Sequence, residues 1–459
     1  MKRGWALAAV AMAAACRGTE ESDRWRYERL FYEQEPSIQS RNDARERYRR
    51  LGEQAEFALG DCYQMALYRS ESLAIDGEEL VRIQTQYDQA LGTLLPYVSF
   101  RGILTLQDNP GTAAGSSIQK SFTEEKRGQY QFYGRQALFN GLREFYALRQ
   151  AGALYEAQEH QMRHARLLLY ADTAGAFYSV LQAERDVATT EASLRLAEER
   201  LEELVQRNRV GISRRSEVLA QEAETASIQA QLESLRGLFA VSWEALIFLT
   251  GLGKHRTLRD TLPDPQQAPP AEEFVARALQ TREDLRALER REAAAEEAVG
   301  IARAGYLPTA LLEANYYTHR EGISADIDWD AVLTLEIPIF EGLTTQAKVR
   351  EAWSARRAAA MSRQRLRRDI ELSIKRAHAD LLASTAVRAS LEKAVASARE
   401  TYEIVQAEYR RGISTNVEVL TVFNTLQQAR LEFDRARYQS KLARIRLEVQ
   451  SGTLPGGTP

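Results

Sequence analysis

Two histidines one helical turn apart are the residues whose spacing comes nearest to a chemical site. His160 and His164 lie four positions apart in a helical pattern, where two imidazoles can share a zinc ion. The glutamate of a zinc-protease motif is missing between them, and the sequence offers no evident third ligand. We therefore expect a pair on the surface of a helix and no metal site.

A second stretch has the composition of a phosphate site without its spacing. Residues 251–254 read Gly-Leu-Gly-Lys, and a phosphate-binding loop needs more residues between its glycines. Such a loop also follows a strand, whereas a helical pattern precedes Gly251. The sequence pairs no nucleophile with a base. We therefore predict that the protein is not an enzyme, with no catalytic residues and no cofactor.

The N-terminus carries a processing signal. Lys2 and Arg3 form a short basic region, an alanine-rich apolar region follows, and residues 1–15 together predict a signal peptide. Small residues directly before Cys16 are typical of bacterial lipoprotein signals. We therefore expect cleavage before Cys16 and a lipid anchor that includes palmitate, with a flexible tether over residues 16–41. The alternative is a simple secretory signal with an Ala-x-Ala cleavage site.

Composition excludes several classes of protein. Charged residues make up 27% of the chain and are nearly balanced in sign, so the net charge of −3 favours no nucleic-acid partner. Besides Cys16 the chain has only Cys62, so no disulfide can form within the mature chain. The half-apolar helical pattern around Cys62 predicts core packing. No run of 18 apolar residues occurs, so any membrane crossing must use strands.

Two very long helical stretches dominate the chain. From Gly141 to Gly211, and again from Gly342 to Gly412, 70 positions pass without a proline. At about 1.5 Å per residue each helix is about 100 Å long, which exceeds the thickness of a globular core. A helix of this length is typical of a coiled coil, a bundle or a tube.

A pair of strands precedes each long helix. Residues 96–106 alternate between apolar and mixed side chains, and so do residues 130–139, with an exposed loop between them. The second pair is predicted at 309–318 and 329–340. About ten residues suit a tilted strand that crosses a bilayer.

The order of elements occurs twice. The two long stretches are 201 residues apart throughout, whereas Pro96 and Pro308, which end the helices before the strands, are 212 apart. The difference falls around the strand pairs, where the first loop is longer, so the chain contains an internal duplication. We expect a first repeat at 42–250, a connector at 251–270, a second repeat at 271–450 and a disordered tail at 451–459. Residues 42–94 predict helix with a break near Asp76-Gly77.

Each long helix ends in the same short turn. Gly211 and Gly412 are expected to adopt a positive φ at the helix end, because glycine reaches this conformation without a Cβ clash. Ser213 and Ser414 are expected to cap the helix that follows.

The duplicated order of helix, strand pair, very long helix, glycine turn and helix, behind a lipoprotein signal, resembles the TolC-like outer-membrane efflux protein family, or outer membrane factors. The resemblance covers nearly all of the mature chain. Besides order and spacing it rests on the segments Tyr306-Leu307-Pro308, Ile337-Pro338-Ile339-Phe340-Glu341-Gly342, Arg209-Val210-Gly211-Ile212-Ser213 and Arg411-Gly412-Ile413-Ser414. Arg17, and not aspartate, follows the cysteine. By resemblance to lipoprotein sorting in many Gram-negative bacteria, this favours the outer membrane.

The resemblance implies a fold class. It implies a mainly α protein with a small β part, in which three copies share a twelve-stranded β-barrel continuous with a periplasmic α-barrel of twelve helices. The strand prediction agrees on physical grounds, because four strands cannot close a barrel and an open edge is not tolerated in lipid. We therefore expect a homotrimer.

By the same resemblance the turns form a periplasmic tip that contacts the hairpin of an adaptor protein. The residues that this assigns to adaptor contact are Arg209, Gly211, Ser213, Leu219, Arg410, Gly412, Ser414 and Leu420. For the two leucines, packing within the tip is the alternative.

Glu217 and Glu418 each lie six residues after a turn glycine. The resemblance implies that an acidic residue there lines a narrow entrance, where three copies bring their carboxylates together and favour cations. The alternative is a solvated first-turn glutamate that complements the helix dipole. Ala220 and Thr421 occupy positions where some members of the family carry a second acid, which counts against a tightly gated entrance.

The resemblance also implies a function. It implies the outer-membrane exit duct of a tripartite efflux system, a passive channel for drugs, toxic compounds or metal ions. Its partners are a periplasmic adaptor, an inner-membrane pump of the RND or ABC type and outer-membrane lipid, with the lipid-anchored protein extending into the periplasm. The alternatives are a conduit for type I protein secretion and, in a different class, a lipid-anchored periplasmic coiled-coil scaffold without a pore. The strand pairs favour the duct, because a scaffold does not need them.

Overall fold

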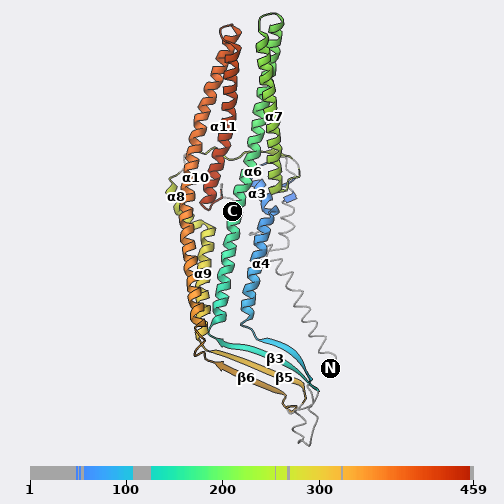
Figure 1. Ribbon diagram of the computed structural model, residues 1–459, viewed down its shortest axis with the longest axis vertical. Helices are drawn as coiled ribbons and strands as arrows, with labels where there is room; N and C mark the ends of the chain where they lie inside the picture. Colours follow the sequence, from blue (N-terminus) through green and yellow to red (C-terminus); the bar gives the residue numbers. More distant parts are fainter. Residues whose placement is uncertain are drawn as a thin grey trace. The chain divides into compact units, whose positions relative to one another are not determined.

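The structure is a computed structural model that describes residues 48–49, 51–52, 56–106, 126–253, 255–265, 269–321 and 324–454 (Figure 1). The predicted signal peptide at 1–15, the tether at 16–41 with Cys16, and residues 455–459 lie outside the described residues. The chain divides into two compact units. The described part of unit 1 extends to Gly77 and includes Gln161–Asp284 and the chain from Leu366, and unit 2 contains Glu78–His160 and Leu285–Arg365.

Helices make up most of the described chain. Two of them, α6 and α10, have 67 residues each, and they coincide with the two long proline-free stretches. The principal helices are α3 (Leu59–Arg69), α4 (Glu71–Gly92), α6 (Arg143–Arg209), α7 (Arg215–Thr250), α8 (Ala271–Thr281), α9 (Glu283–Arg303), α10 (Thr344–Arg410) and α11 (Asn416–Gln450). The short 3-10 turn η1 (Ala304–Tyr306) follows α9.

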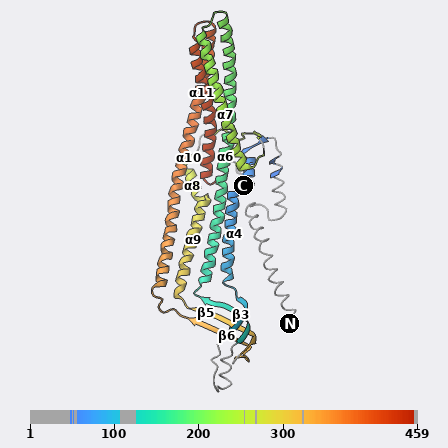
Figure 2. The same cartoon turned by 45° about the vertical axis from the view of Figure 1, so that its right-hand side comes forward.

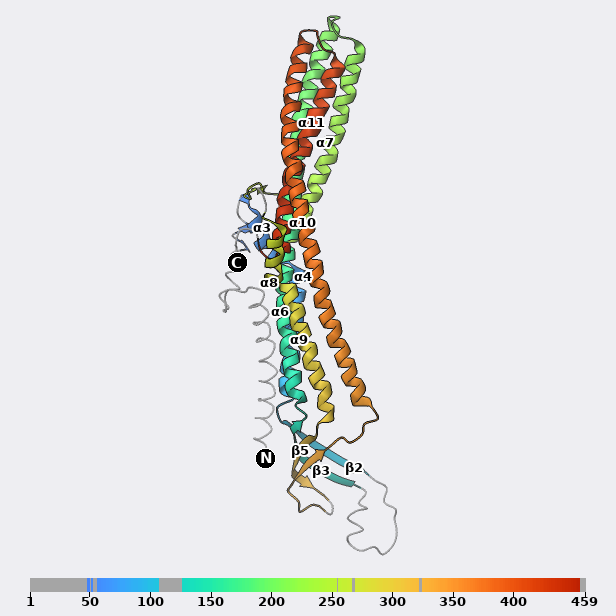
Figure 3. The ribbon, with the colours of Figure 1, turned by 90° about the vertical axis from the view of Figure 1, so that its left-hand side faces the viewer.

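Unit 1 is a bundle of long helices with its main core beside α3. Its parts of α6 and α10 run side by side with α7 and α11 (Figure 3). The core contains Tyr170 and Phe177 of α6, Trp243 of α7 and Cys62 of α3. Cys62 is fully buried, which confirms its predicted packing role, and burial raises the pKa of its thiol to about 12. The short strands β1 (Glu56–Phe57) and β4 (Thr257–Leu258) pair in parallel beside this core.

Unit 2 contains an antiparallel sheet and four helical segments. The strands are β2 (Tyr97–Leu106), β3 (Lys126–Asn140), β5 (Thr309–Arg320) and β6 (Trp329–Glu336), in the order β2-β3-β5-β6. The helical segments run side by side in the order α4, α6, α9, α10 (Figures 1 and 2). Helices and strands therefore follow the same lateral order, with the first repeat on one side and the second on the other.

The break predicted near Asp76-Gly77 is wrong. Helix α4 continues through both residues, and the break lies at Ser70, whose backbone is extended. The hydroxyl of Ser70 accepts a hydrogen bond from Leu73 N–H at 3.3 Å, so serine caps α4. A cap residue starts a helix more effectively than one internal glycine stops it.

Two other boundaries differ from the prediction. Strand β6 ends at Glu336, before the expected limit of 340, and Pro338 has no N–H to continue the ladder. The described start of the tail is ordered, since Ser451 is buried and its carbonyl accepts a hydrogen bond from Thr281 Oγ1 at 3.0 Å. The expectation of disorder from 451 is therefore wrong for residues 451–454.

The junctions from strand to long helix are alike in the two repeats. Gly141 and Leu142 have φ of 62° and 63°, and Gly342 and Leu343 have φ of 61° and 67°. A Cβ on Gly141 would lie 2.5 Å from the carbonyl oxygen of Ala304, so this glycine is required for space as well as for its φ. The leucines adopt a conformation that is costly for a residue with a Cβ.

Candidate functional site

Both turns are closed by the same backbone hydrogen bonds. Gly211 and Gly412 have φ of 80° and 77°. The N–H of the isoleucine that follows each glycine donates to the carbonyl five residues earlier, at 2.9 Å for Ile212 and 3.0 Å for Ile413. A Cβ on either glycine would meet nothing within 4 Å, so the positive φ alone requires glycine. The conformation predicted for the two glycines is confirmed.

The capping role predicted for the two serines is wrong. The N-cap of α7 is Arg214, which makes no side-chain cap, and the N-cap of α11 is Thr415. Thr415 Oγ1 accepts from Glu418 N–H at 3.3 Å, and the Glu418 carboxylate accepts from Thr415 N–H at 2.7 Å. This is a reciprocal capping box.

The serines bind the glutamates of the turns instead. Ser213 Oγ donates to Glu217 at 2.5 Å, and Ser414 Oγ donates to Glu418 at 2.5 Å. The hydroxyl of Ser414, followed by the N–H of Thr415, holds the pKa of Glu418 below its usual value. Both carboxylates therefore accept a hydrogen bond within their own turn.

The residues assigned to adaptor contact differ in exposure. Those on the surface are Arg209, Gly211, Leu219, Arg410 and Gly412. Ser414 and Leu420 are half-buried, whereas Ser213 is buried and faces Glu217. Val210, Ile212 and Ile413 are exposed by 69%, 68% and 71%. The motifs contained these three apolar side chains, but the sequence analysis gave them no role.

A cluster of side chains joins the two hairpins next to the turns. Leu204, Val218, Tyr409 and Val419 form a buried apolar group to which α6, α7, α10 and α11 each contribute one residue. The guanidinium of Arg200 lies 4.4 Å from the centre of the Tyr409 ring. Both turns therefore belong to one packed end of unit 1.

Arg200 adds a polar bond to this cluster. It donates to Asn416 Oδ1 at 2.9 Å, and Asn416 is only 2% exposed. Burial raises the pKa of Tyr409, whose ring lies under Arg200. Sequence reasoning missed this bond, and the available signal was a difference between the repeats. The positions equivalent to Tyr409 and Asn416 hold Asn208 and Arg215, so the duplication does not extend to these side chains.

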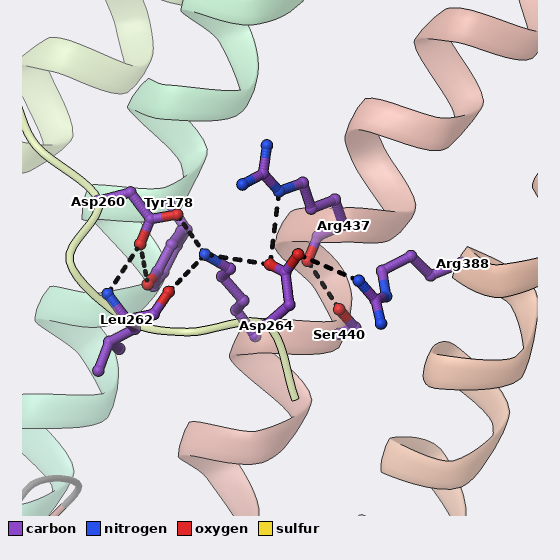
Figure 4. A network of polar contacts seen from close by, with 8 residues as sticks. Tyr178, Asp260, Leu262, Asp264, Arg388, Arg437 and Ser440 are labelled. Carbon is purple, nitrogen blue, oxygen red and sulfur yellow. Dashed lines mark hydrogen bonds and ion pairs between the residues drawn. The ribbon is translucent and has the colours of Figure 1, made fainter. Parts of the chain in front are cut away.

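Lys441 fastens the connector to the bundle, and Figure 4 labels its partners Asp260, Leu262 and Asp264. Lys441 is 3% exposed, and its amine forms an ion pair with Asp260. It also donates to the carbonyl of Leu262 at 2.6 Å and lies 3.2 Å from Asp264. Tyr178 of α6 donates to Asp260 at 3.0 Å from the other side. We call these residues the Lys441 network.

Two arginines complete the Lys441 network. Arg388 of α10 and Arg437 of α11 donate to the Asp264 carboxylate at 3.1 and 3.4 Å (Figure 4). Burial by itself would raise the pKa of Asp264, but the bond from Lys441 and the charge of Arg437 outweigh it and leave this pKa lowered. The segment predicted only as a connector thus links three long helices.

The sheet has one polar and one apolar face. Tyr133 donates to Glu313, and Asn315 accepts from Gln131 at 2.9 Å and donates to Asp330 at 2.8 Å. On the opposite face, Phe100, Phe132, Tyr316 and Trp329 are successive register partners across all four strands. They are exposed by 47%, 48%, 57% and 67%. An exposed aromatic row on an apolar face is typical of contact with a membrane interface.

His160 and His164 both occupy half-buried positions of α6. His164 of α6 is half-buried and lies 3.9 Å from Asp284, and its pKa is lowered because burial outweighs that carboxylate. Across the described ranges, no three His, Cys, Asp or Glu side chains are grouped so that they could hold a metal ion. Among the helices that the structure describes, none combines the length and the apolar composition that crossing a membrane requires.

Comparison with protein families gives one model that matches most of the chain. It is described as outer membrane efflux protein, and it matches residues 62–252 and 274–453. The chain is also similar to the outer membrane protein TolC of Vibrio cholerae serotype O1, with 25% identity over 292 residues that cover 61% of this chain and 67% of that protein.

Two further comparisons agree. The outer membrane protein OprJ of Pseudomonas aeruginosa is 27% identical over 282 residues, which cover 58% of this chain and 57% of that protein. The matched regions thus cover between 57% and 67% of the length of these curated relatives. Among solved structures, the transmembrane channel CusC superposes with a TM-score of 0.76 at 17% identity, covering 86% of this chain and 92% of that one. This likeness concerns the fold.

Proposed function

Because the chain belongs to the outer membrane efflux protein family, we propose that it forms the outer-membrane exit duct of a tripartite efflux system. In this role it is a passive channel through which drugs, other toxic compounds or metal ions leave the cell. The observation that supports this best is the aromatic row on the exposed apolar face of the sheet, from Phe100 to Trp329. A sheet with one such face and one polar face suits a wall between lipid and water.

The proposal includes three copies of the chain. Within the described residues, β2 and β6 each pair with one strand, so both edges of the sheet have unpaired backbone groups. Such edges are not tolerated in lipid, and further copies can satisfy them by closing a barrel. A homotrimer agrees with this requirement.

The two turns are the proposed contact with a periplasmic adaptor, which in turn meets an inner-membrane pump. The exposed glycines and the apolar side chains of Val210, Ile212 and Ile413 present backbone and apolar surface at one end of unit 1. The buried Tyr409 cluster joins both hairpins there, so a partner that binds one turn acts on both.

The acidic entrance ring is a finer proposal. Glu217 and Glu418 lie in the turns, and three copies would bring their carboxylates near one axis. Conductance measured in a salt gradient tests this, because the variant with Glu217→Gln and Glu418→Gln should lose cation preference if the ring exists. An unchanged preference would leave both residues with the structural role described above.

Lipid attachment at Cys16 places the protein at the outer membrane with its helices in the periplasm. This proposal rests on the lipoprotein-like signal alone. Replacing Cys16 by serine should abolish palmitate labelling, and a mature variant that is still labelled would show that the anchor lies elsewhere.

Two measurements test the duct. Purified protein should give stable channels in a planar bilayer, and a product that does not conduct would contradict the proposal. In cells, Gly211→Trp together with Gly412→Trp should abolish export without changing membrane insertion. Gly237→Trp is a matched control, because Gly237 is also exposed and a Cβ there meets nothing within 4 Å. Normal drug tolerance with the double variant would count against the turns as the adaptor contact.

A further inference from the structure

The two repeats meet along a seam inside unit 2, which we call the inner seam. It joins α6 to α9 and β3 to β5. Glu156 of α6 forms an ion pair with Arg290 of α9 at 2.9 Å. In the sheet, Arg135 of β3 and Glu313 of β5 are register partners. Opposite charges therefore face each other across the inner seam in both its helical and its strand part.

The outer edges of unit 2 are made of the equivalent elements. Helix α10 and strand β6 in the second repeat correspond to α6 and β3, with an offset of 201 residues. Helix α4 and strand β2 in the first repeat correspond to α9 and β5, with an offset of 212. The α10–β6 edge is therefore equivalent to the α6–β3 side of the inner seam. The α4–β2 edge is equivalent to the α9–β5 side.

The outer edges carry the opposite charges at the positions equivalent to Glu156 and Arg290. The residue equivalent to Glu156 is Arg357, and the residue equivalent to Arg290 is Glu78. Both are exposed, and within the described part of the chain neither has an ion-pair partner. Each lies about four turns from the strand-side end of its helix, so the two residues have the same level in the unit.

Two neighbouring arginines of α10, unlike Arg357, have ion-pair partners within the chain. Arg356 and Arg363 point toward α9 and pair with Glu296 at 3.6 Å and with Glu292 at 3.0 Å. Arg357 is rotated by about 100° around α10 from Arg356, so it does not share the face that Arg356 and Arg363 turn toward α9. Its partner must come from outside this chain or from solvent.

The edge strands also carry the opposite charges at the positions equivalent to Arg135 and Glu313. The residue equivalent to Arg135 is Glu336 at the end of β6, and the residue equivalent to Glu313 is Arg101 of β2. Both are exposed and belong to the two edge strands of the sheet. Not every position follows this rule, since the second helical pair, Arg149 with Glu297 at 3.2 Å, becomes Arg350 opposite Thr85.

We propose that the α4–β2 edge of one copy binds the α10–β6 edge of the next copy, with Glu78 against Arg357 and Arg101 against Glu336. This interface rests on the trimer of the proposed function and adds the residues that form it. The exchange of charges also gives specificity. If α4 of another copy took the place of α9 on α6, Glu78 would face Glu156, and like charges would oppose that pairing.

Chemical cross-linking of the full-length protein tests the helical contact. The variant with Glu78→Cys and Arg357→Cys, treated in membranes with a short bifunctional maleimide, should give a covalent trimer whose linked peptides contain positions 78 and 357. The matched control, Glu156→Cys with Arg290→Cys, should become linked within single chains and give no covalent trimer. A trimer that an amine-reactive cross-linker detects, without a 78–357 link, overturns this interface and leaves the proposed trimer standing. No trimer with either reagent overturns both.

Charge exchange gives a second readout. Arg357→Glu should weaken assembly by about tenfold, because three exposed ion pairs are replaced by three repulsions. Adding Glu78→Arg should restore assembly. The trimer fraction is measured by native mass spectrometry across a dilution series. If the double variant assembles no better than Arg357→Glu alone, the pairing is wrong.

Discussion

Helices α7 and α11 have equivalent places in the two repeats, yet their polar side chains bind different parts of the molecule. In α7, Arg236 forms an ion pair with Glu191 of α6, in its own repeat, at 2.9 Å. In α11, Asn416 accepts a hydrogen bond from Arg200 of α6 in the other repeat. Lys441, further along α11, holds the connector between the repeats.

This difference rests on few positions. The residues of α7 equivalent to Asn416 and Lys441 are Arg215 and Ala240, and both are exposed. The helical pattern of the duplication therefore places both helices, whereas single polar residues decide whether a helix is bonded to its own repeat or across to the other. Substitution of these polar residues should therefore affect α11 more than α7. The equivalent change in α7 is a matched control for each change in α11.

The largest effect is expected at Lys441. Lys441→Met removes the amine that the Asp260 and Asp264 carboxylates share, and breaking a buried ion pair on one side costs about 3–5 kcal/mol. The equivalent change in α7, Ala240→Met, lies on the surface and should alter stability by less than about 0.5 kcal/mol. Urea unfolding followed by far-ultraviolet circular dichroism measures both, and equal losses would remove the distinction between the helices.

Asn416→Ala should have the next largest effect. It leaves the guanidinium of Arg200 without its bond to a buried amide and should cost about 1–3 kcal/mol. Arg215→Ala, its counterpart in α7, should cost almost nothing. Hydrogen exchange of the amides around Tyr409 reports the local loss, and protection that is unchanged by Asn416→Ala would show that the bond does not join the hairpins.

The turn glycines should behave alike, in contrast to the helices that follow them. Gly211→Ala and Gly412→Ala each force a Cβ into the left-handed region and should each cost about 1–2 kcal/mol. Since no neighbouring atom lies within 4 Å in either turn, the two losses should agree. Thermal unfolding of the two variants checks this, and a large difference would mean that the turns depend on their surroundings.

The caps should again differ. Thr415→Ala removes the side-chain cap of α11 and should cost about 1 kcal/mol, whereas Arg214→Ala removes no cap from α7 and should be nearly neutral. Thermal unfolding of the two variants under one set of conditions gives the comparison. A loss of the same size for Arg214→Ala would mean that side-chain capping does not distinguish the two turns.

The smallest effect concerns pH. The pKa of Glu418 is lower in the folded protein than in the unfolded chain, mainly because of the Ser414 hydroxyl. Its contribution is therefore present above the unfolded pKa and is lost as pH falls through the folded pKa. Glu418→Gln should be less stable than the wild type at neutral pH, and this difference should vanish in acid. A difference that persists at low pH would show that the charge of Glu418 is not the cause.

Sequence patterns were sufficient for features that depend on local geometry. The long proline-free stretches placed α6 and α10. The alternation of apolar and mixed side chains, together with the repeat, placed the four strands. The conformation of Gly211 and Gly412 also followed, because a helix end that reverses direction requires a positive φ at one residue. The polar and apolar faces of the sheet could also be predicted, because successive side chains of a strand point to opposite faces.

The sequence did not show which of several nearby residues caps or ends a helix. Ser414 and Thr415 are both good caps, and only the backbone geometry selects Thr415. The break in the first helix was predicted near Asp76-Gly77, whereas Ser70 caps α4. Lys441 received no role from the sequence, because its partners lie about 180 positions away in the chain.

Leu142 and Leu343 each follow a glycine with a positive φ and adopt one themselves. A leucine in that conformation costs about 1–2 kcal/mol, and both side chains are well exposed, so packing returns little of this energy. Asparagine tolerates the same conformation better. The two strand-to-helix junctions are thus places where an engineer can make this chain more stable than nature left it, by the same substitution made twice.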